Sequence, residues 1–388
     1  MSTVADSHAS ESPPRSGQAS LKLACDREQL LHAFQTVAAV APSRSPKPIL
    51  QNVKLEATAD RVELSATDLE IGIRHTVAGV DIHQPGTVIL PNARFGSILR
   101  ESTDETLHLE SDGTSTSVVG ERSRFRLSAE DAHEFPPVAE FDSQTSVQLH
   151  GRLFRELVRR TAFATDNESS RYALGGVKLE FDGSSVTAIG TDGRRLAKMT
   201  GEVSGSIDTE QTLIVPTRAM QLIERGISPT DEEVRVAVRG NELLVTSDTF
   251  TISSRLLEGR FPDWKKVFPD TAGAVKLELA VGATLSAVRQ AAIVTSEESR
   301  GIDFTFNDGL LVLSGVAAEV GQSRIELPIG YDGDELTITL DPRFVIDFLK
   351  VLDAEKTFAM EVRDSESAAV LSTDDGYGYV IMPLARDR

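Results

Sequence analysis

The residues that most often carry catalysis are present, but not in any arrangement typical of a catalytic site. Seven histidines are scattered along the chain, and none follows His150. The single cysteine, Cys25, excludes a cysteine metal cluster or a redox pair. The chain has no GxGxxG, Walker A, GxSxG or HExxH motif. We therefore expect no catalysis, metal or cofactor. A metal-dependent hydrolase using some of the 59 acidic residues is the alternative, and the lack of a clustered His/Asp set weighs against it.

One segment, Thr191-Asp192-Gly193-Arg194-Arg195-Leu196, combines a glycine with polar and basic residues. A loop of this composition can bind phosphate through its backbone N–H groups. A tight turn that ends a strand accounts for the same residues more simply, because Asp and Gly are favoured in turns. We therefore interpret the segment as a turn.

Arginines recur on one side of a segment expected to be helical, 149–163. Arg152, Arg155 and Arg159 stand at positions i, i+3 and i+7. The apolar residues of the segment have the spacing of a separate helical face, and they are Leu153, Phe154, Leu157, Val158 and Ala162. The arginine face can attract a polyanion, although an ordinary solvated helix surface can also carry arginines.

The charge of the chain is unevenly distributed. With 40 basic and 59 acidic residues the net charge is −19, which argues against a general nucleic-acid binder. The six expected helices nevertheless carry +5 over 75 residues, whereas the other 313 residues carry −24. Such a protein can attract a polyanion to its helices and repel it elsewhere. An acidic scaffold that binds only proteins is a further alternative, and the basic helices disfavour it.

The sequence repeats weakly three times. Pro91 recurs 125 residues later as Pro216, and Thr67-Asp68 recurs after 124 residues as Thr191-Asp192. Phe135-Pro136 recurs after 126 residues as Phe261-Pro262. This period predicts three tandem domains, at 21–145, 146–271 and 272–388, after a tail at 1–20.

Each repeat has the same order of expected elements. An amphipathic helix opens it, at 26–37, 149–163 and 282–295. A second helix follows a proline, at 91, 216 and 342, and proline suits the first turn of a helix. Between them lie short alternating segments typical of antiparallel strands, such as 177–181 before the turn Asp182-Gly183. The fold class is therefore α+β, and the three domains form either an extended array or a ring without sheet edges.

The first 20 residues are rich in serine, proline and small polar residues, which predicts a disordered tail. No secretory signal precedes the domains, and no apolar run approaches the roughly 18 residues that a membrane span needs. With a single cysteine, these features predict a cytoplasmic protein.

Over about residues 21–384 the chain resembles the β sliding clamp family, the β subunits of bacterial DNA polymerase III. The motifs that carry the resemblance are Arg171-Tyr172-Ala173-Leu174-Gly175-Gly176, Thr191–Leu196, Gly259-Arg260-Phe261-Pro262-Asp263-Trp264 and Tyr379-Val380-Ile381-Met382-Pro383-Leu384. The resemblance implies a head-to-tail homodimeric ring, with helices lining a central hole. It also implies that the ring encircles duplex DNA without sequence specificity, tethers the replicative polymerase and is opened by a clamp-loader ATPase.

The resemblance further implies three sets of site residues. The first is a cleft for the short peptide of the polymerase α subunit and other clamp-binding proteins, formed by Leu174, Thr191, Gly193, Arg194, Arg195, Leu196, Pro262, Lys266, Val267, Val380, Met382, Pro383 and Leu384. The second set contacts DNA and comprises Arg44, Arg152, Arg155, Arg159, Arg171 and Tyr172. The third joins the two copies, with Ile98 and Phe125 on one side and Ile293 and Val294 on the other. In the cleft, apolar residues would accept Leu or Phe anchors, with Met382 adapting its shape. Ala173, Lys266 and Ala385 depart from the family pattern.

Overall fold

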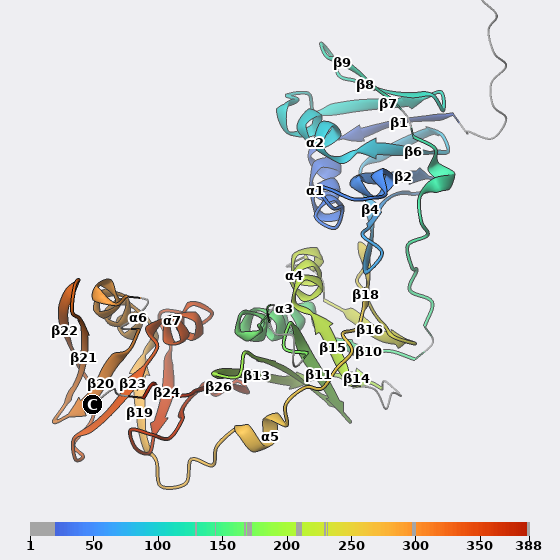
Figure 1. The fold of residues 1–388 in the computed structure, drawn as a ribbon. Helices are drawn as coiled ribbons and strands as arrows, with labels where there is room; N and C mark the ends of the chain where they lie inside the picture. Colours follow the sequence, from blue (N-terminus) through green and yellow to red (C-terminus); the bar gives the residue numbers. More distant parts are fainter. Residues whose placement is uncertain are drawn as a thin grey trace, which may run out of the picture. The chain divides into compact units, whose positions relative to one another are not determined.

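The computed structural model describes residues 20–128, 130–143, 145–166, 168, 173–206, 212–228, 230, 232–296 and 300–385. The chain divides into two compact units, the first ending at Glu140 and the second beginning at Phe141. Figure 1 shows the helices and strands of both units.

The described residues of the first unit form two sets of antiparallel strands and two helices. One sheet has the order β5 (Val80–Gln84), β1 (Leu21–Asp26), β7 (Thr106–Ser111), β8 (Ser115–Val119) and β9 (Arg124–Ser128). The other runs β4 (Ile71–Val77), β3 (Val62–Thr67), β2 (Asn52–Ala57) and β6 (Gly86–Pro91). The helices are α1 (Arg27–Ala38) and α2 (Asn92–Glu101), with 3-10 turns at Pro48–Gln51 and Ala132–Glu134.

The helices of this unit follow directly from the sequence. Asp26 caps α1, because its side chain accepts a hydrogen bond of 2.8 Å from the backbone N–H of Gln29. Phe34 of α1 and Phe95 of α2 are both buried, and their rings meet edge to face at 5.1 Å. The two helices are therefore held together by an aromatic contact.

The described residues of the second unit form three sets of antiparallel strands. A five-stranded set runs β14 (Ser204–Gly205), β10 (Val147–Leu149), β16 (Val234–Arg239), β17 (Glu242–Thr246) and β18 (Phe250–Arg255). An eight-stranded sheet runs β15 (Leu213–Pro216), β11 (Gly176–Asp182), β12 (Ser185–Thr191), β13 (Arg195–Glu202), β26 (Tyr377–Ile381), β25 (Ala369–Ser372), β24 (Thr357–Val362) and β19 (Val275–Ala280). A four-stranded sheet runs β22 (Gly321–Pro328), β21 (Leu310–Ala317), β20 (Ile302–Asn307) and β23 (Leu336–Leu340).

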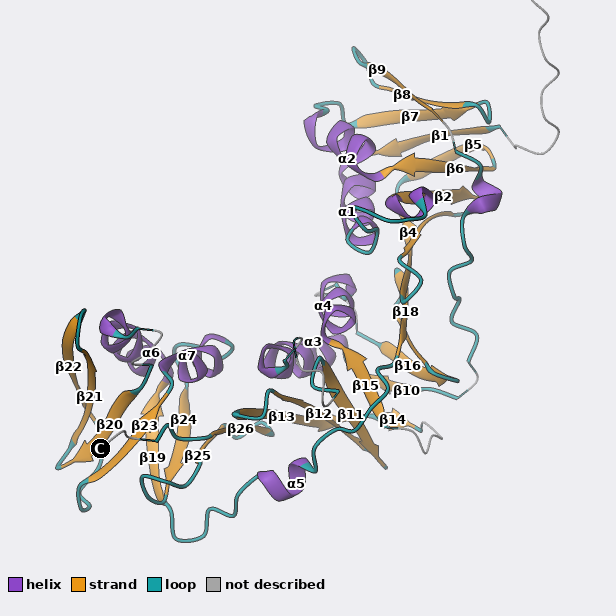
Figure 2. Ribbon diagram, viewed as in Figure 1, coloured by secondary structure: helices purple, strands orange, loops and turns teal. Residues whose placement is uncertain are grey.

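The helices of the second unit are α3 (Gly151–Thr161), α4 (Thr217–Gly226), α5 (Trp264–Val267), α6 (Val281–Ala291) and α7 (Pro342–Lys350). The 3-10 turns Ala162–Ala164 and Ala292–Val294 follow α3 and α6. Within this unit, α3, α4, α6 and α7 lie on one side of the sheets (Figure 2). Helix α5 lies on the other side, in the linker between β18 and β19, residues 256–274. The four longer helices thus share one surface.

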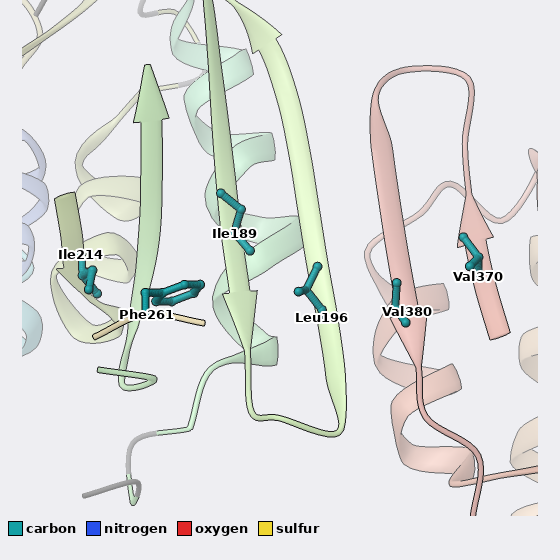
Figure 3. Packing of buried hydrophobic residues seen from close by; sticks show 6 residues of the cluster. All are labelled: Ile189, Leu196, Ile214, Phe261, Val370 and Val380. Atoms are coloured by element: carbon teal, nitrogen blue, oxygen red, sulfur yellow. The ribbon is translucent and has the colours of Figure 1, made fainter. Parts of the chain in front are cut away.

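The eight-stranded sheet joins the second and third sequence repeats. β13 of the second repeat pairs with β26 of the third, with Leu196 opposite Val380. On the helical side, Phe348 of α7 stacks on Tyr377 and Tyr379 at 5.2 and 5.3 Å. On the other side, Phe261 of the linker packs with apolar residues from both repeats (Figure 3), namely Ile189, Leu196, Ile214, Val370 and Val380. The junction is therefore a continuous sheet with a core on each face.

Some of the elements expected from the sequence match the structure, and others differ from it. β11 and the turn at Asp182-Gly183 match the prediction, and Gly183 has a positive φ of 56°. The helices lie within a few residues of the expected segments. The expectation that all three prolines enter the first turn of a helix is wrong for two of them. Pro91 and Pro216 end strands β6 and β15 with extended ψ angles of 113° and 136°.

Only Pro342 lies in the first turn of its helix. Pro91 and Pro216 instead precede their helices, because the fixed φ of proline suits the extended residue before a helix as well as the first helical residue. The tail falls outside the described residues up to residue 19. Across the part that is described, no helix is long and apolar enough to cross a membrane.

Candidate functional site

The segment Thr191–Leu196 forms a tight turn between β12 and β13, as predicted. Gly193 has a φ of 86°, which favours glycine. Its N–H donates to the Thr191 hydroxyl at 3.1 Å, and the N–H groups of Arg194 and Arg195 donate to Asp192 at 2.9 and 3.0 Å. Because the turn uses these N–H groups itself, they are not available as a phosphate cradle.

The turn lies against the end of β26. The N–H of Met382 donates to the carbonyl of Arg194 at 2.9 Å, and Arg195 is the strand partner of Ile381. The pairing brings together seven of the residues assigned to the peptide cleft, namely Thr191, Gly193, Arg194, Arg195, Leu196, Val380 and Met382. Backbone hydrogen bonds therefore hold these residues beside one another.

The expected apolar floor is largely covered. Leu174, Leu196 and Val380 are only 5%, 1% and 1% exposed. Val267 and Met382, in contrast, are 45% and 46% exposed. Pro262, Pro383 and Leu384 are half-buried, and Lys266 is exposed and pairs with Asp263 at 2.9 Å. The accessible apolar surface is therefore provided by Val267 and Met382.

Met382 lies one residue past the end of β26. Its side chain is nearly half exposed and so does not belong to the core beside that strand. Pro383 and Leu384 line a separate cavity of about 510 Å³ with Thr337, Thr339 and Glu366. The end of the described chain therefore presents two neighbouring features, an exposed methionine and a small cavity.

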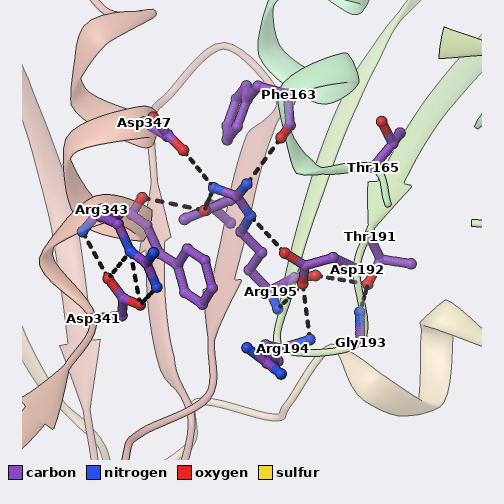
Figure 4. A network of polar contacts seen from close by, with 12 residues as sticks. Phe163, Thr165, Thr191, Asp192, Gly193, Arg194, Arg195, Asp341, Arg343 and Asp347 are labelled. Carbon is purple, nitrogen blue, oxygen red and sulfur yellow. Dashed lines mark hydrogen bonds and ion pairs between the residues drawn. The ribbon is translucent and has the colours of Figure 1, made fainter. Parts of the chain in front are cut away.

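Arg195 is held within the chain by a polar network (Figure 4). Its Nε donates to Asp192 at 3.0 Å, its Nη1 to Asp347 of α7 at 2.7 Å, and its Nη2 to the carbonyl of Phe163 at 2.9 Å. The guanidinium also lies 4.5 Å from the ring centre of Phe344. Burial alone would lower the pKa of Arg195, but its acidic and phenolic neighbours outweigh burial and raise it. Arg195 therefore links the two repeats as a permanent cation.

A second buried arginine, Arg160, makes a similar link that sequence reasoning missed. It is 9% exposed and bonds Glu156 at 2.8 Å and Asp375, from the third repeat, at 2.7 Å. Its guanidinium also lies 5.2 Å from the ring centre of Tyr377. The sequence does indicate that Arg160 is buried, because it stands seven residues after Leu153 and three after Leu157, on the apolar side of the helix.

The basic residues assigned to DNA contact differ in exposure. Arg44, in the first unit, and Arg152 are exposed, whereas Arg155 is half-buried. Arg159 is half exposed and bonds Glu156 at 3.1 Å and the carbonyl of Val351 at 2.9 Å. Arg171 and Tyr172 lie outside the described residues. Within α3, Arg152 therefore presents the most available charge.

The residues assigned to the dimer contact also differ in exposure. Ile98 is only 8% exposed and belongs to the core of the first unit, whereas Phe125 of β9 is 39% exposed. Ile293 is 76% exposed, and Val294 beside it is half-buried. β9 and β22 are each the last strand of their sheet. Exposed apolar residues thus occur beside two open sheet edges.

No group of three or more His, Cys, Asp or Glu side chains that could hold a metal ion occurs in the described residues. Cys25 is buried, and burial raises the pKa of its thiol to about 12. A thiol with this pKa remains protonated and unreactive.

Three tandem domains, each with two helices and antiparallel sheets, define a DNA clamp fold. Family models of the DNA polymerase III beta subunit match the chain in order, with the N-terminal domain at residues 21–139, the central domain at 148–263 and the C-terminal domain at 265–385. The chain belongs to the DNA polymerase III beta subunit family, the beta sliding clamps.

Individual relatives agree with this assignment. The chain is 30% identical over 373 residues to the beta sliding clamp of Chlamydia trachomatis, covering 94% of this chain and 87% of the relative. It is 30% identical over 362 residues to the beta sliding clamp of Pseudomonas aeruginosa, and the match covers 92% of this chain and 98% of the relative. The crystal structure of the Pseudomonas aeruginosa sliding clamp bound to griselimycin matches this chain with a TM-score of 0.87 at 28% identity. The match covers 95% of this chain and 100% of that structure. The crystal structure of the Bacillus subtilis sliding clamp has the same fold, with a TM-score of 0.86 at 22% identity. The match covers 94% of this chain and 99% of that structure.

Proposed function

We propose that this sliding clamp closes around duplex DNA as a head-to-tail homodimer and tethers the replicative polymerase. The observation that carries the proposal is the concentration of positive charge on the helices, +5 over 75 residues in a chain of net charge −19. In the second unit these helices lie on one side of the sheets (Figure 2). That surface can attract the DNA backbone while the acidic remainder repels it.

The dimer proposal is supported by the two open sheet edges, at β9 and at β22. An unpaired edge strand exposes a row of N–H and C=O groups that favours addition of another strand. We place β9 of one copy against β22 of the other, with Phe125 and Ile293 covering each other's apolar surface. A head-to-tail contact of this kind makes a ring when the rotation closes. The contact would also cover the two exposed side chains, at 39% and 76% exposure.

The partner site is proposed at the junction of β13 and β26, within the domains at 146–271 and 272–388. Val267 and Met382 provide exposed apolar surface for a Leu or Phe anchor, and Arg194 and Lys266 provide positive charge at the rim. Burying two such anchors contributes about 1.5–3 kcal/mol each. Ordering the peptide offsets much of this, so a micromolar affinity is expected.

The partners that fit this site are the α subunit of DNA polymerase III, the clamp-loader ATPase and other proteins with a clamp-binding motif. Encirclement holds a polymerase on DNA without a reaction of its own, so we assign no catalytic residue, metal or cofactor. We place the protein in the cytoplasm, with the replication machinery.

Retention on circular DNA tests encirclement. Clamp loaded onto a closed circle should remain bound in high salt, because topology rather than charge holds it there. Binding to a short linear duplex should be weak and should decrease with salt, since few phosphates are neutralised at once. Cutting a loaded circle should then release the clamp rapidly. Equal release from cut and intact circles would refute encirclement.

A turnover assay addresses the alternative of a hydrolase. We expect no hydrolysis of DNA or nucleotides with or without divalent metal. A metal-dependent rate that follows the protein through purification would contradict the proposal.

A further inference from the structure

A row of side chains crosses the non-helical face of the eight-stranded sheet. The register pairs Lys178 with Ile189, Ile189 with Lys198, and Lys198 with Gly378 of β26. Residues that are paired across strands lie on the same face of a sheet. Two lysines therefore stand on the face that carries the apolar cluster, where an alternating pattern would place apolar residues.

Aromatic residues of the linker cover these lysines. The ammonium of Lys198 lies 4.3 Å from the ring centre of Phe268 and 5.7 Å from that of Trp264. The ammonium of Lys178 lies 5.7 Å from the ring centre of Phe261. A cation within about 6 Å of an aromatic face is attracted by the ring, and more strongly when it is shielded from water.

The two lysines differ in their other partners. Lys178 forms an ion pair with Glu180 at 2.6 Å. For Lys198 no ion pair with a carboxylate is found among the described residues, and burial lowers the pKa of its ammonium. The two rings therefore provide the main compensation for the charge of Lys198.

The contact also involves the third repeat. A Cβ atom on Gly378 would lie 2.9 Å from Cζ of Phe268 and 3.0 Å from Cε of Lys198. Only glycine at this position lets the ring of Phe268 and the stem of Lys198 approach the sheet so closely. Phe268 is thus held at the pairing of β13 with β26, where the two repeats meet.

We infer that Lys198 is a positioning residue of the partner site: its ammonium, held between Phe268 and Trp264, fixes the linker on the sheet and thereby places Val267 at the rim. The inference rests on the proposed function. Val267 lies between Trp264 and Phe268 in sequence, so it has little freedom once both rings are fixed. Its side chain is 45% exposed, as a contact for a peptide anchor requires.

The chain provides a direct probe of this contact, because Trp264 is its single tryptophan. The full-length clamp is compared with Lys198→Met, which keeps the unbranched stem and removes the charge, and with Lys198→Arg, which keeps a cation. Lys276→Met is the matched control, since Lys276 is exposed on β19. Trp264 emission and its quenching by iodide report on the linker. Fluorescence polarisation of a labelled, short Gln- and Leu/Phe-containing peptide reports on binding.

We expect Lys198→Met to shift the Trp264 emission to longer wavelength and to increase quenching. Peptide affinity should fall about tenfold, the size expected for losing a shielded cation–π contact. Lys198→Arg should restore most of both properties, and Lys276→Met should change neither. Unchanged emission, or unchanged affinity despite altered emission, would overturn the positioning role.

Gly378→Ala provides a second route to the same contact if Lys198→Met does not fold. The added methyl group should displace Phe268, with the same loss of affinity while Lys198 is present. Wild-type affinity in a folded Gly378→Ala protein with altered emission would also overturn the inference. If the wild-type clamp bound no peptide at all, the proposed function would fail instead, and the emission of the variants would still test the contact between Lys198 and the linker.

Discussion

Replacing Arg195 by methionine should destabilise the junction between the second and third repeats. Methionine keeps much of the apolar stem but removes every hydrogen bond of the guanidinium. Asp192 and Asp347, with side chains 17% and 33% exposed, then lose their cation, and the carbonyl of Phe163 loses a donor. Breaking a fully buried ion pair costs about 3–5 kcal/mol.

Partial exposure of Asp347 reduces this cost, because water can solvate the abandoned carboxylate. We therefore expect a loss of about 2–4 kcal/mol in the free energy of unfolding. Arg194→Met is the matched control, since Arg194 is the exposed neighbour in the same turn. That change should alter stability by no more than about 0.5 kcal/mol.

Urea unfolding followed by Trp264 emission measures both variants against the wild type, with calorimetry to identify separate transitions. A double-mutant cycle of Arg195→Met with Asp347→Asn should give a coupling energy of about 0.5–3 kcal/mol. A coupling near zero, or equal stability of Arg195→Met and Arg194→Met, would refute the role of Arg195 as a link between repeats.

Three further predictions concern the other contacts. Ile293→Asp should shift the protein from dimer to monomer in light scattering, because it buries a charge without a partner; an unchanged dimer would show that the interface lies elsewhere. Removing residues 382–388 should abolish peptide binding in a calorimetric titration and leave the dimer intact, so full affinity in a dimeric truncation would exclude the site. Burial alone would raise the pKa of Asp375, but hydrogen bonds from Thr373 and Arg160 outweigh it and lower the pKa below 3.8. The stability that wild type gains over Asp375→Asn should therefore be complete above about pH 4 and decrease as the pH falls through the lowered pKa, and a difference that did not decrease on acidification would contradict this.

Much of the fold follows from local signals in the sequence. The threefold period, the amphipathic helices and turns such as Asp182-Gly183 all depend on residues close together in the chain. Proline predicts the start of a helix less well, because its fixed φ also suits the strand end at Pro91 and Pro216. Short-range patterns thus predict which elements exist better than they predict where the elements end.

The candidate site was less predictable, because it depends on contacts between distant residues. The motifs indicated which residues surround the cleft, but not that Leu196 and Val380 are buried in one apolar cluster with Phe261 of the linker. The ion pair of Arg160 with Asp375 spans 215 residues, and no local pattern identifies such a partner. The aromatic cover of Lys198 is equally non-local, since Phe268 lies 70 positions further along the chain.

The pairing of β13 with β26 has a consequence for biosynthesis. Leu196 and Val380 are strand partners separated by 184 positions. Translation at about 5–20 residues per second therefore leaves the β13 edge without its native neighbour for roughly 10–40 s. During that interval the nascent middle domain exposes an edge beside Leu196, Ile189 and other apolar residues, the combination that favours aggregation. Completion of the chain is therefore also the step that ends this exposure, so a ribosome stalled before residue 377 would hold a protein in need of a chaperone.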